Sequence, residues 1–223
     1  MSPSENNAAP ALPEMRTAGL LATNYFLIKA PEGWVLFDAP QGVAEEIRGL
    51  GLKISALVLT HGHFDHIWEA TKIADDHDCP IYAHDADGIL LRSPGAFGWF
   101  FPPAEGIPPI PKWTSIAVPD RGAADWSVCG QAFRIFHIPG HSAGSVAFYL
   151  PEAGYVIAGD TLFAGGLGRW DFPGGSLETL RNGIHQHLMS LPESTRIYPG
   201  HGPATTVGRE ARSNRYLRDD FME

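Results

Sequence analysis

A six-residue segment near residue 60 constrains the fold of this chain more than any other feature. It reads His61-Gly62-His63-Phe64-Asp65-His66 and follows a buried β-branched run over residues 54–59. His61 and His63 are two residues apart, so their side chains can point to one side of an extended backbone. Gly62 between them permits a tight bend. Neutral imidazole is the commonest metal ligand that histidine supplies, so this pattern indicates a metal site.

The second half of the same segment predicts a second ion. Asp65 and His66 are adjacent, so their side chains diverge and serve another point in space. A tetrahedral ion takes about four ligands in total, and this segment alone supplies four. If other parts of the chain contribute as well, the spacing favours two metal ions close together.

Further candidate ligands follow three other predicted strands. His141, Asp160 and His201 each come just after an apolar run and each has a glycine next to it. Rigid scaffolds commonly build active sites from such strand ends. With the opening segment they make seven ligands, which two ions sharing one carboxylate and one hydroxide would use. Asp38 ends another strand, where it is either a carboxylate behind the ligands or a strand-end cap.

The remaining histidines have no partner at ligand spacing. We expect His137 to be structural, His185 and His187 to lie on the surface, and His77 and His84 to have no role in metal binding. Cys79 and Cys129 belong to no spaced motif, which predicts two free thiols in a reducing compartment, with a disulfide between them as the alternative.

Apolar periodicity divides the chain into two similar halves. The first contains predicted strands over residues 25–28, 34–37, 54–59 and 81–83 and helices over 43–50 and 67–74. The second contains strands over 133–138, 145–150, 155–159 and 195–198 and helices over 177–191 and 207–217. Each half therefore runs from strands to a helix, which predicts an α/β (α+β) fold with two sheets packed face to face and helices outside.

Length and net charge limit the number of domains and the classes of binding partner. The 223 residues suit one domain over residues 16–223, preceded by a flexible tail over residues 1–15. A net charge of −9 without a basic run disfavours nucleic acid and anionic lipid surfaces. No signal-peptide pattern and no apolar run of membrane-spanning length occurs, so we expect a cytoplasmic protein.

The opening segment resembles the His-x-His-x-Asp-His signature of the metallo-β-lactamase fold superfamily. This resemblance implies an αββα sandwich of two mixed sheets. It also implies that His61, His63 and His141 hold the first metal, that Asp65, His66 and His201 hold the second, and that Asp160 bridges both. Asp65 and Asp160 are then the catalytic carboxylates. Zinc is the expected metal, although His/Asp sites also accept iron and manganese.

Two other segments resemble the glyoxalase II branch, the hydroxyacylglutathione hydrolases. They are residues 159–169, ending in Arg169, and residues 198–203. The chain lacks the C-terminal helical domain of glyoxalase II proper, so it looks like the short form. The resemblance implies a thioesterase that cleaves small-molecule thioesters of the acylglutathione type with a metal-bridging hydroxide.

Two alternatives stay open at this point. Residues 168–172 also resemble the persulfide dioxygenases, which use a single iron, although Pro199-Gly200-His201-Gly202 follows the hydrolase form of the last motif. A non-catalytic metal-binding or regulatory protein is the other alternative. Loss of a ligand would indicate it, and all seven are present.

The stretch over residues 93–113 has no period and is rich in proline and aromatic residues. Long irregular loops in compact domains are usually functional or disordered. We predict a wall or lid over the metals, with Trp99, Phe100 and Arg169 as substrate contacts. Packing on the domain and a homodimer interface are the alternatives for this loop.

Overall fold

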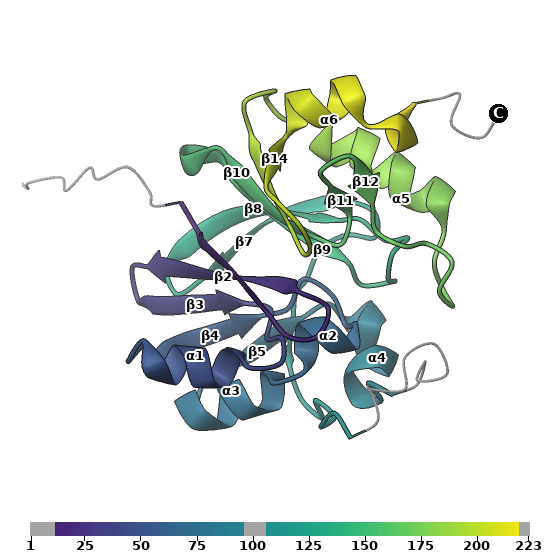
Figure 1. The fold of residues 1–223 in the computed structure, drawn as a ribbon. Helices are drawn as coiled ribbons and strands as arrows, with labels where there is room; N and C mark the ends of the chain where they lie inside the picture. Colours follow the sequence, from purple (N-terminus) through teal and green to yellow (C-terminus); the bar gives the residue numbers. More distant parts are fainter. Residues whose placement is uncertain (1–11, 96–105, 219–223) are drawn as a thin grey trace, which may run out of the picture.

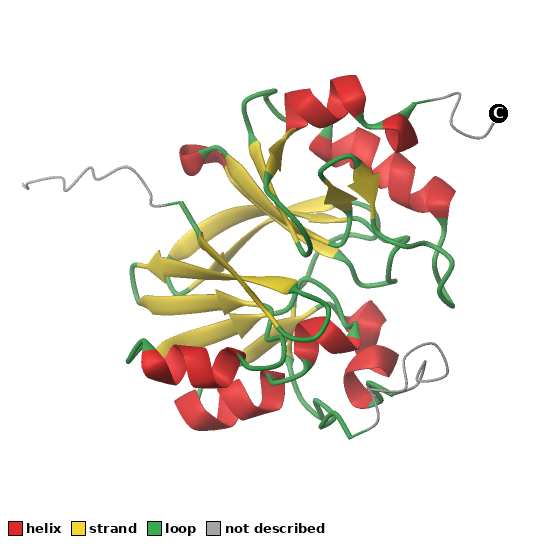
Figure 2. Ribbon diagram, in the orientation of Figure 1, coloured by secondary structure: helices red, strands yellow, loops and turns green. Residues whose placement is uncertain are grey.

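The computed structural model describes residues 12–95 and 106–218 and has four layers, as Figures 1 and 2 show. One six-stranded sheet has the order β1 (Glu14–Ala18), β2 (Thr23–Ala30), β3 (Gly33–Phe37), β4 (Ile54–Val58), β5 (Ile81–Ala83), β6 (Thr114–Ser115). The other has the order β14 (Thr205–Thr206), β13 (Arg196–Pro199), β10 (Tyr155–Gly159), β9 (Val146–Leu150), β8 (Gln131–His137), β7 (Ala123–Val128). A small hairpin joins β11 (Leu162–Phe163) to β12 (Gly166–Leu167).

Helices cover the outer face of each sheet (Figure 1). The first sheet is flanked by α1 (Val43–Gly49), α2 (Phe64–Ile67), α3 (Ala70–His77) and α4 (Gly88–Arg92). The second is flanked by α5 (Leu177–Gly183), which continues as a π-helical turn over Ile184–Leu188, and by α6 (Val207–Ser213). This arrangement confirms the predicted fold class. In the part of the chain that the structure describes, every helix is too short or too polar to cross a bilayer.

The alternation of side chains along each strand explains why helices cover the two packed sheets. Val35 and Phe37 face the apolar core between the two sheets, whereas Leu36 faces α1 and α3. In the second sheet Ile157 faces the same central core and Val156 faces α5. Successive side chains of a strand point to opposite faces of the sheet. Apolar residues occupy successive positions of these strands, so both faces of each sheet are buried. The outer face of each sheet is therefore apolar, and the helices bury it.

The central core gives a direct test of this packing. Ile135 is fully buried between the sheets, so Ile135→Val should lower the free energy of unfolding by about 0.5–1.5 kcal/mol, because a methyl-sized void remains. Ile89, 70% exposed on α4, is the matched control, and Ile89→Val should change stability little. Urea denaturation measures both. Equal effects of the two variants would contradict the assigned core.

Several predicted boundaries were wrong. The tail predicted over residues 1–15 ends too late, because Glu14 and Met15 already pair with β2 in β1; residues 1–11 lie outside the described part. The helix predicted over 67–74 is divided between α2 and α3. Glu69 accounts for the break, because its N–H donates to Ala39 O and its carboxylate accepts from Ala44 N.

The four strands at the sheet edges, β1, β6, β7 and β14, were not predicted. β6 has only two residues, and β7 is half-exposed and lacks a clear apolar alternation. The helix predicted to reach Leu217 ends at Ser213 and is followed by a 3₁₀ turn over Arg215–Leu217. Edge strands need little apolar sequence because one of their sides has no strand partner.

Only the two ends of the predicted loop over residues 93–113 are described. Ile110 is fully buried in the core beneath the first sheet, and Trp113 donates from Nε1 to Asp85. These ends pack on the domain. Trp99 and Phe100 lie outside the described residues, so the lid over the metals stays a prediction.

Candidate metal centre

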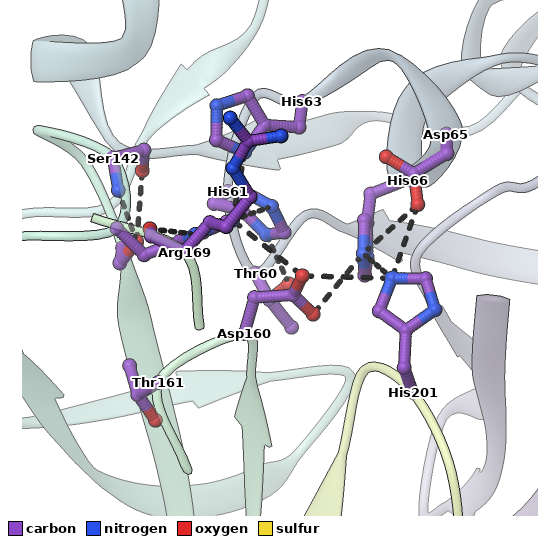
Figure 3. Close-up of polar contacts among 12 residues, drawn as sticks. Thr60, His61, His63, Asp65, His66, Ser142, Asp160, Thr161, Arg169 and His201 are labelled. Atoms are coloured by element: carbon purple, nitrogen blue, oxygen red, sulfur yellow. Dashed lines mark hydrogen bonds and ion pairs between the residues drawn. The ribbon is translucent and has the colours of Figure 1, made fainter. Parts of the chain in front are cut away.

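Strand direction explains why the candidate ligands meet. In the first sheet β3, β4 and β5 are parallel, so Asp38 and the segment after β4 leave the same edge. In the second sheet β8 and β10 both run antiparallel to β9, and β13 runs parallel to β10. The carboxyl ends of these three strands therefore share one edge. The seven predicted ligands converge where the two edges face each other. Figure 3 labels His61, His63, Asp65, His66, Asp160 and His201 among them.

The first group contains three histidines, His61, His63 and His141. Nε2 of His141 lies 2.8 Å from Nδ1 of His63 and 3.1 Å from Nε2 of His61. His61 and His141 are almost fully buried, and His63 is half-buried. Two ligand atoms about 2.0–2.1 Å from a tetrahedral zinc lie roughly 3.3 Å apart, so the spacing fits one ion.

The second group contains Asp65, His66 and His201. Oδ2 of Asp65 lies 3.5 Å from Nε2 of His66 and 3.2 Å from Nε2 of His201. The two imidazole nitrogens are 3.4 Å apart. This group also has the spacing of ligands around one ion.

Asp160 lies between the two groups. Its Oδ2 is 3.5 Å from Nε2 of His141 and 3.5 Å from Nε2 of His201, and its Oδ1 is 3.3 Å from Nε2 of His66. Oδ1 is buried and accepts no hydrogen bond from any described residue. A buried carboxylate oxygen without a hydrogen-bond donor is costly unless a cation satisfies it. This orphaned oxygen therefore fits a metal on the side of the second group.

Hydrogen bonds at the outer nitrogens orient the imidazoles. Nδ1 of His66 donates to Asp38 Oδ2 at 2.8 Å, and Nδ1 of His141 donates to the Arg169 carbonyl at 2.7 Å. Nδ1 of His201 donates to Leu21 O at 3.2 Å. Each bond leaves the lone pair of Nε2 pointing inward, which is how metal-binding histidines are usually held.

Thr60 and Asp38 form a small network behind the ligands. The carboxylate of Asp38 is fully buried and accepts from the N–H and the hydroxyl of Thr60, both at 2.8 Å. Since the Thr60 hydroxyl donates to Asp38, it accepts from Nδ1 of His61 at 3.1 Å. Asp38 has a φ of +61°, in the left-handed region that aspartate tolerates better than most residues. Of the two alternatives for Asp38, a carboxylate behind the ligands therefore describes its position, rather than a strand-end cap alone.

The electrostatics of the cluster suit a cation. Burial lowers the pKa of His61 and His141 and brings that of His63 to about 3, so these rings are neutral at pH 7. Burial alone would raise the pKa of Asp65 and Asp160, but the neighbouring histidines outweigh it and lower both. Burial alone would lower the pKa of His66 and His201, but Asp65 and Asp160 outweigh it and raise both. A metal at the second group therefore takes the place of protons on these two rings, since neutral imidazoles and ionised carboxylates are the states that bind divalent metals.

Aromatic and charged side chains form the rim. Phe172 lies with its ring centroid 5.1 Å from that of His63, and Phe163 lies 6.0 Å from the ring of His201. Arg169, a predicted substrate contact, is about half-exposed, pairs with Asp171 and lies 4.3 Å above the Phe172 ring. The guanidinium of Arg169 lies at this rim, while its backbone carbonyl accepts from Nδ1 of His141.

The other histidines lie outside this cluster. His137 is structural as expected, since its Nδ1 accepts from Arg121 N and its Nε2 donates to Ala143 O. The surface prediction was wrong for His187, which is buried, stacks on Phe136 and donates to Arg121 O. Both cysteines are free thiols, and burial raises the pKa of Cys79 to about 11.

The sequence pattern did not identify three polar residues that support the cluster. Thr23 donates to Oδ2 of Asp65 at 2.8 Å, and Thr60 connects His61 to Asp38. Asp87 accepts from the N–H of Gly62, the residue between His61 and His63. Thr60 directly precedes the ligand segment, which is a usable signal. Thr23 and Asp87 are far from it in the chain and carry none.

Comparisons with known proteins agree with this geometry. Residues 18–201 match the family described as the metallo-beta-lactamase superfamily. The chain is 34% identical to the probable metallo-hydrolase YqgX of Bacillus subtilis, covering 91% of this chain and 95% of that protein. It is 36% identical to the hydroxyacylglutathione hydrolase GloC of Haemophilus influenzae, covering 80% and 84%.

Solved structures extend the likeness to three dimensions. TTHA1623 in a di-iron-bound form is 36% identical, with a TM-score of 0.77 over 92% of this chain and 100% of that one. The B3 metallo-beta-lactamase BLEG-1 is 29% identical, with a TM-score of 0.83 over 92% and 99%.

Proposed function

Because the chain belongs to the metallo-β-lactamase superfamily, whose members are mostly metal-dependent hydrolases, we propose that it hydrolyses small-molecule thioesters of the acylglutathione type. The observation that carries the proposal is the pair of three-ligand groups joined by the carboxylate of Asp160. The likeness to the hydroxyacylglutathione hydrolase GloC supports the substrate class.

We assign one ion to His61, His63 and His141, a second to Asp65, His66 and His201, and Asp160 to both. When bound, two divalent ions supply a Lewis acid and lower the pKa of a shared water toward neutrality. Zinc fits these ligands, as do iron and manganese. The protein's part is to hold seven donors at fixed spacing, with the histidines of the first group neutral and both aspartates ionised.

The hydroxyl groups beside the cluster are bound to carboxylates. Those of Thr60, Thr23 and Ser142 donate to Asp38, Asp65 and Asp87 respectively. This engagement favours water over a serine or threonine hydroxyl as the nucleophile. Cys79 and Cys129 pack in the apolar cores, away from the ligands.

The protonation of the cluster favours a good leaving group. Asp65 and Asp160 have lowered pKa values, and His66 and His201, whose pKa values are raised, would give up their protons to bind an ion, so none of the four is poised to protonate a departing group at pH 7. A thiol has a pKa of about 8.5, so a thiolate departs without a proton, whereas an amide nitrogen needs one. This chemistry supports a thioester over an amide or a β-lactam.

A persulfide dioxygenase with a single iron is the alternative raised by the sequence. The second group favours the hydrolase, because Asp65, His66 and His201 have ligand spacing of their own.

Thioester hydrolysis is tested with S-D-lactoylglutathione and protein purified without chelator. We expect free thiol to be released in proportion to bound metal, with no oxygen consumed, and penicillins and cephalosporins to be cleaved slowly. Protein treated with chelator and then reloaded with zinc is the control for metal dependence. Oxygen uptake with glutathione persulfide, without thioester cleavage, would overturn the assignment.

A further inference from the structure

Asp87 has a buried carboxylate between β5 and α4, next to the ligands. It ends a 3₁₀ turn over Asp85–Asp87 and is only 3% exposed. Its Oδ2 accepts from the N–H of Gly62 at 2.7 Å and from the hydroxyl of Ser142 at 2.8 Å. Its Oδ1 accepts from the N–H of Gly144 at 2.7 Å. Three donors thus satisfy this carboxylate.

These three donors belong to the two segments that carry the first group of ligands. Gly62 lies between His61 and His63, and Ser142 directly follows His141. One carboxylate therefore connects the loop after β4, in the first sheet, to the loop after β8, in the second. The second group has different support, from Thr23 at Asp65 and from Asp38 at His66.

Two glycines make this close approach feasible. A Cβ at Gly62 would lie 3.0 Å from Cβ of Asp87 and 2.9 Å from Cβ of Leu90. A Cβ at Gly144 would lie 2.7 Å from Cγ of Asp87. Neither glycine has a left-handed φ. Gly62 is therefore needed for contact with Asp87, rather than for the tight bend that the sequence suggested.

We propose that Asp87 is a positioning residue that holds His61, His63 and His141 in the arrangement needed for one ion, and so sets the affinity of the first group alone. The proposal rests on the ligand set proposed above and is independent of which substrate is cleaved. Hydrogen-bond partners of metal ligands typically change metal affinity about 10- to 100-fold when removed. Asp87 contacts the two segments that carry these ligands, through the N–H groups of Gly62 and Gly144 and the hydroxyl of Ser142, so we expect an effect in that range.

The test is a competitive chelator titration with Zn²⁺, in which the two equivalents are resolved as separate steps. In the Asp87→Asn variant an NH₂ group takes the place of one carboxylate oxygen, so at least one of the three hydrogen-bond donors loses its acceptor. We expect one equivalent to bind about 10- to 100-fold more weakly and the other to keep its wild-type affinity. Gly144→Ala, which displaces the carboxylate without altering it, should give the same pattern.

Two matched variants separate positioning from general loosening. Glu210 is a fully buried carboxylate that accepts from Thr205, Asn214 and Gly165 in the other half of the molecule. Glu210→Gln should lower stability comparably while both zinc equivalents bind as in the wild type. Thr23→Val removes the donor to Asp65 and should weaken the other equivalent instead.

The assignment of the weakened equivalent can be read from Co²⁺ spectra, because a site with three histidines beside Asp160 and a site with two histidines and Asp65 beside Asp160 differ in ligand field. Equal weakening of both equivalents in Asp87→Asn, or unchanged affinities in a variant as destabilised as Glu210→Gln, would overturn the proposal. Failure of the wild type to cleave thioesters, with both equivalents bound, would overturn the proposed function and leave this inference intact.

Discussion

Asp160→Asn is expected to reduce bound metal from two equivalents to less than one and to lower thioester hydrolysis by roughly 10²–10⁴-fold. Among the residues that the structure describes, Asp160 is the one carboxylate within 3.5 Å of nitrogen ligands from both groups. Removing one partner of a buried charged interaction costs about 3–5 kcal/mol, and each 1.4 kcal/mol is a factor of ten. The loss should therefore appear in both ions at once.

The substitution changes charge and leaves shape almost unaltered. A Cβ at Gly200 would lie 2.0 Å from Oδ1 of Asp160, and one at Gly168 would lie 1.8 Å from its carbonyl oxygen, so the surroundings fit this side chain closely. Asparagine has the same outline. Elemental analysis and a thiol-release assay on the same preparation measure the two effects.

Asp125→Asn is the control for this variant. Asp125 lies on β7, its side chain is 90% exposed and it pairs with Arg134 on the neighbouring strand. Metal content and activity should match the wild type. An Asp160→Asn protein with two tightly bound ions would show that the carboxylate is not shared.

Stripping the metals should lower the melting temperature by about 10–20 °C. A ligand at one hundred times its Kd stabilises the folded state by about 2.7 kcal/mol, so two ions contribute about 5 kcal/mol. For a chain of this size each kcal/mol corresponds to about 2–4 °C. The ligands come from the ends of strands in both sheets, so the ions also join the two halves.

Differential scanning fluorimetry with and without a strong chelator measures this shift. Chelator saturated with calcium beforehand is the control for its non-specific effects and should leave the melting temperature unchanged. The same chelator should shift Asp160→Asn only slightly, because that variant holds little metal. A shift of less than about 2 °C in the wild type would contradict ions that join the two sheets.

The convergence of all seven candidate ligands could be predicted because each follows an apolar strand. The sheet brings strand ends together whatever the details of the loops, so His141, Asp160 and His201 could be placed beside the opening segment before any contact was known. The two layers of sheet followed from the same apolar runs. The proximity of residues far apart in the chain was therefore predictable where strand ends determined their positions.

Asp87 shows what local sequence does not reveal. It stands in Asp85-Ala86-Asp87-Gly88, a composition typical of an exposed turn. Asp85 fits that expectation, whereas Asp87 is buried because Gly62 and Gly144, from two other segments, approach it. Burial of a carboxylate depends on donors that the tertiary fold supplies. β7 was missed for a related reason, since pairing with β8 rather than its own pattern makes it a strand.

Asn24 at the start of β2 has a consequence for the order of assembly. Its N–H donates to Gly200 O, and its side-chain amide donates to the carbonyls of Pro199 and Gly202, so it clamps the turn that carries His201. These contacts span about 175 residues of chain, and closing so large a loop is an entropic cost that is met late in folding. During synthesis, the first three histidines are all available once residue 141 has emerged. The second ion must wait for the far end of the chain to return to its beginning, so we expect the two positions to load in sequence.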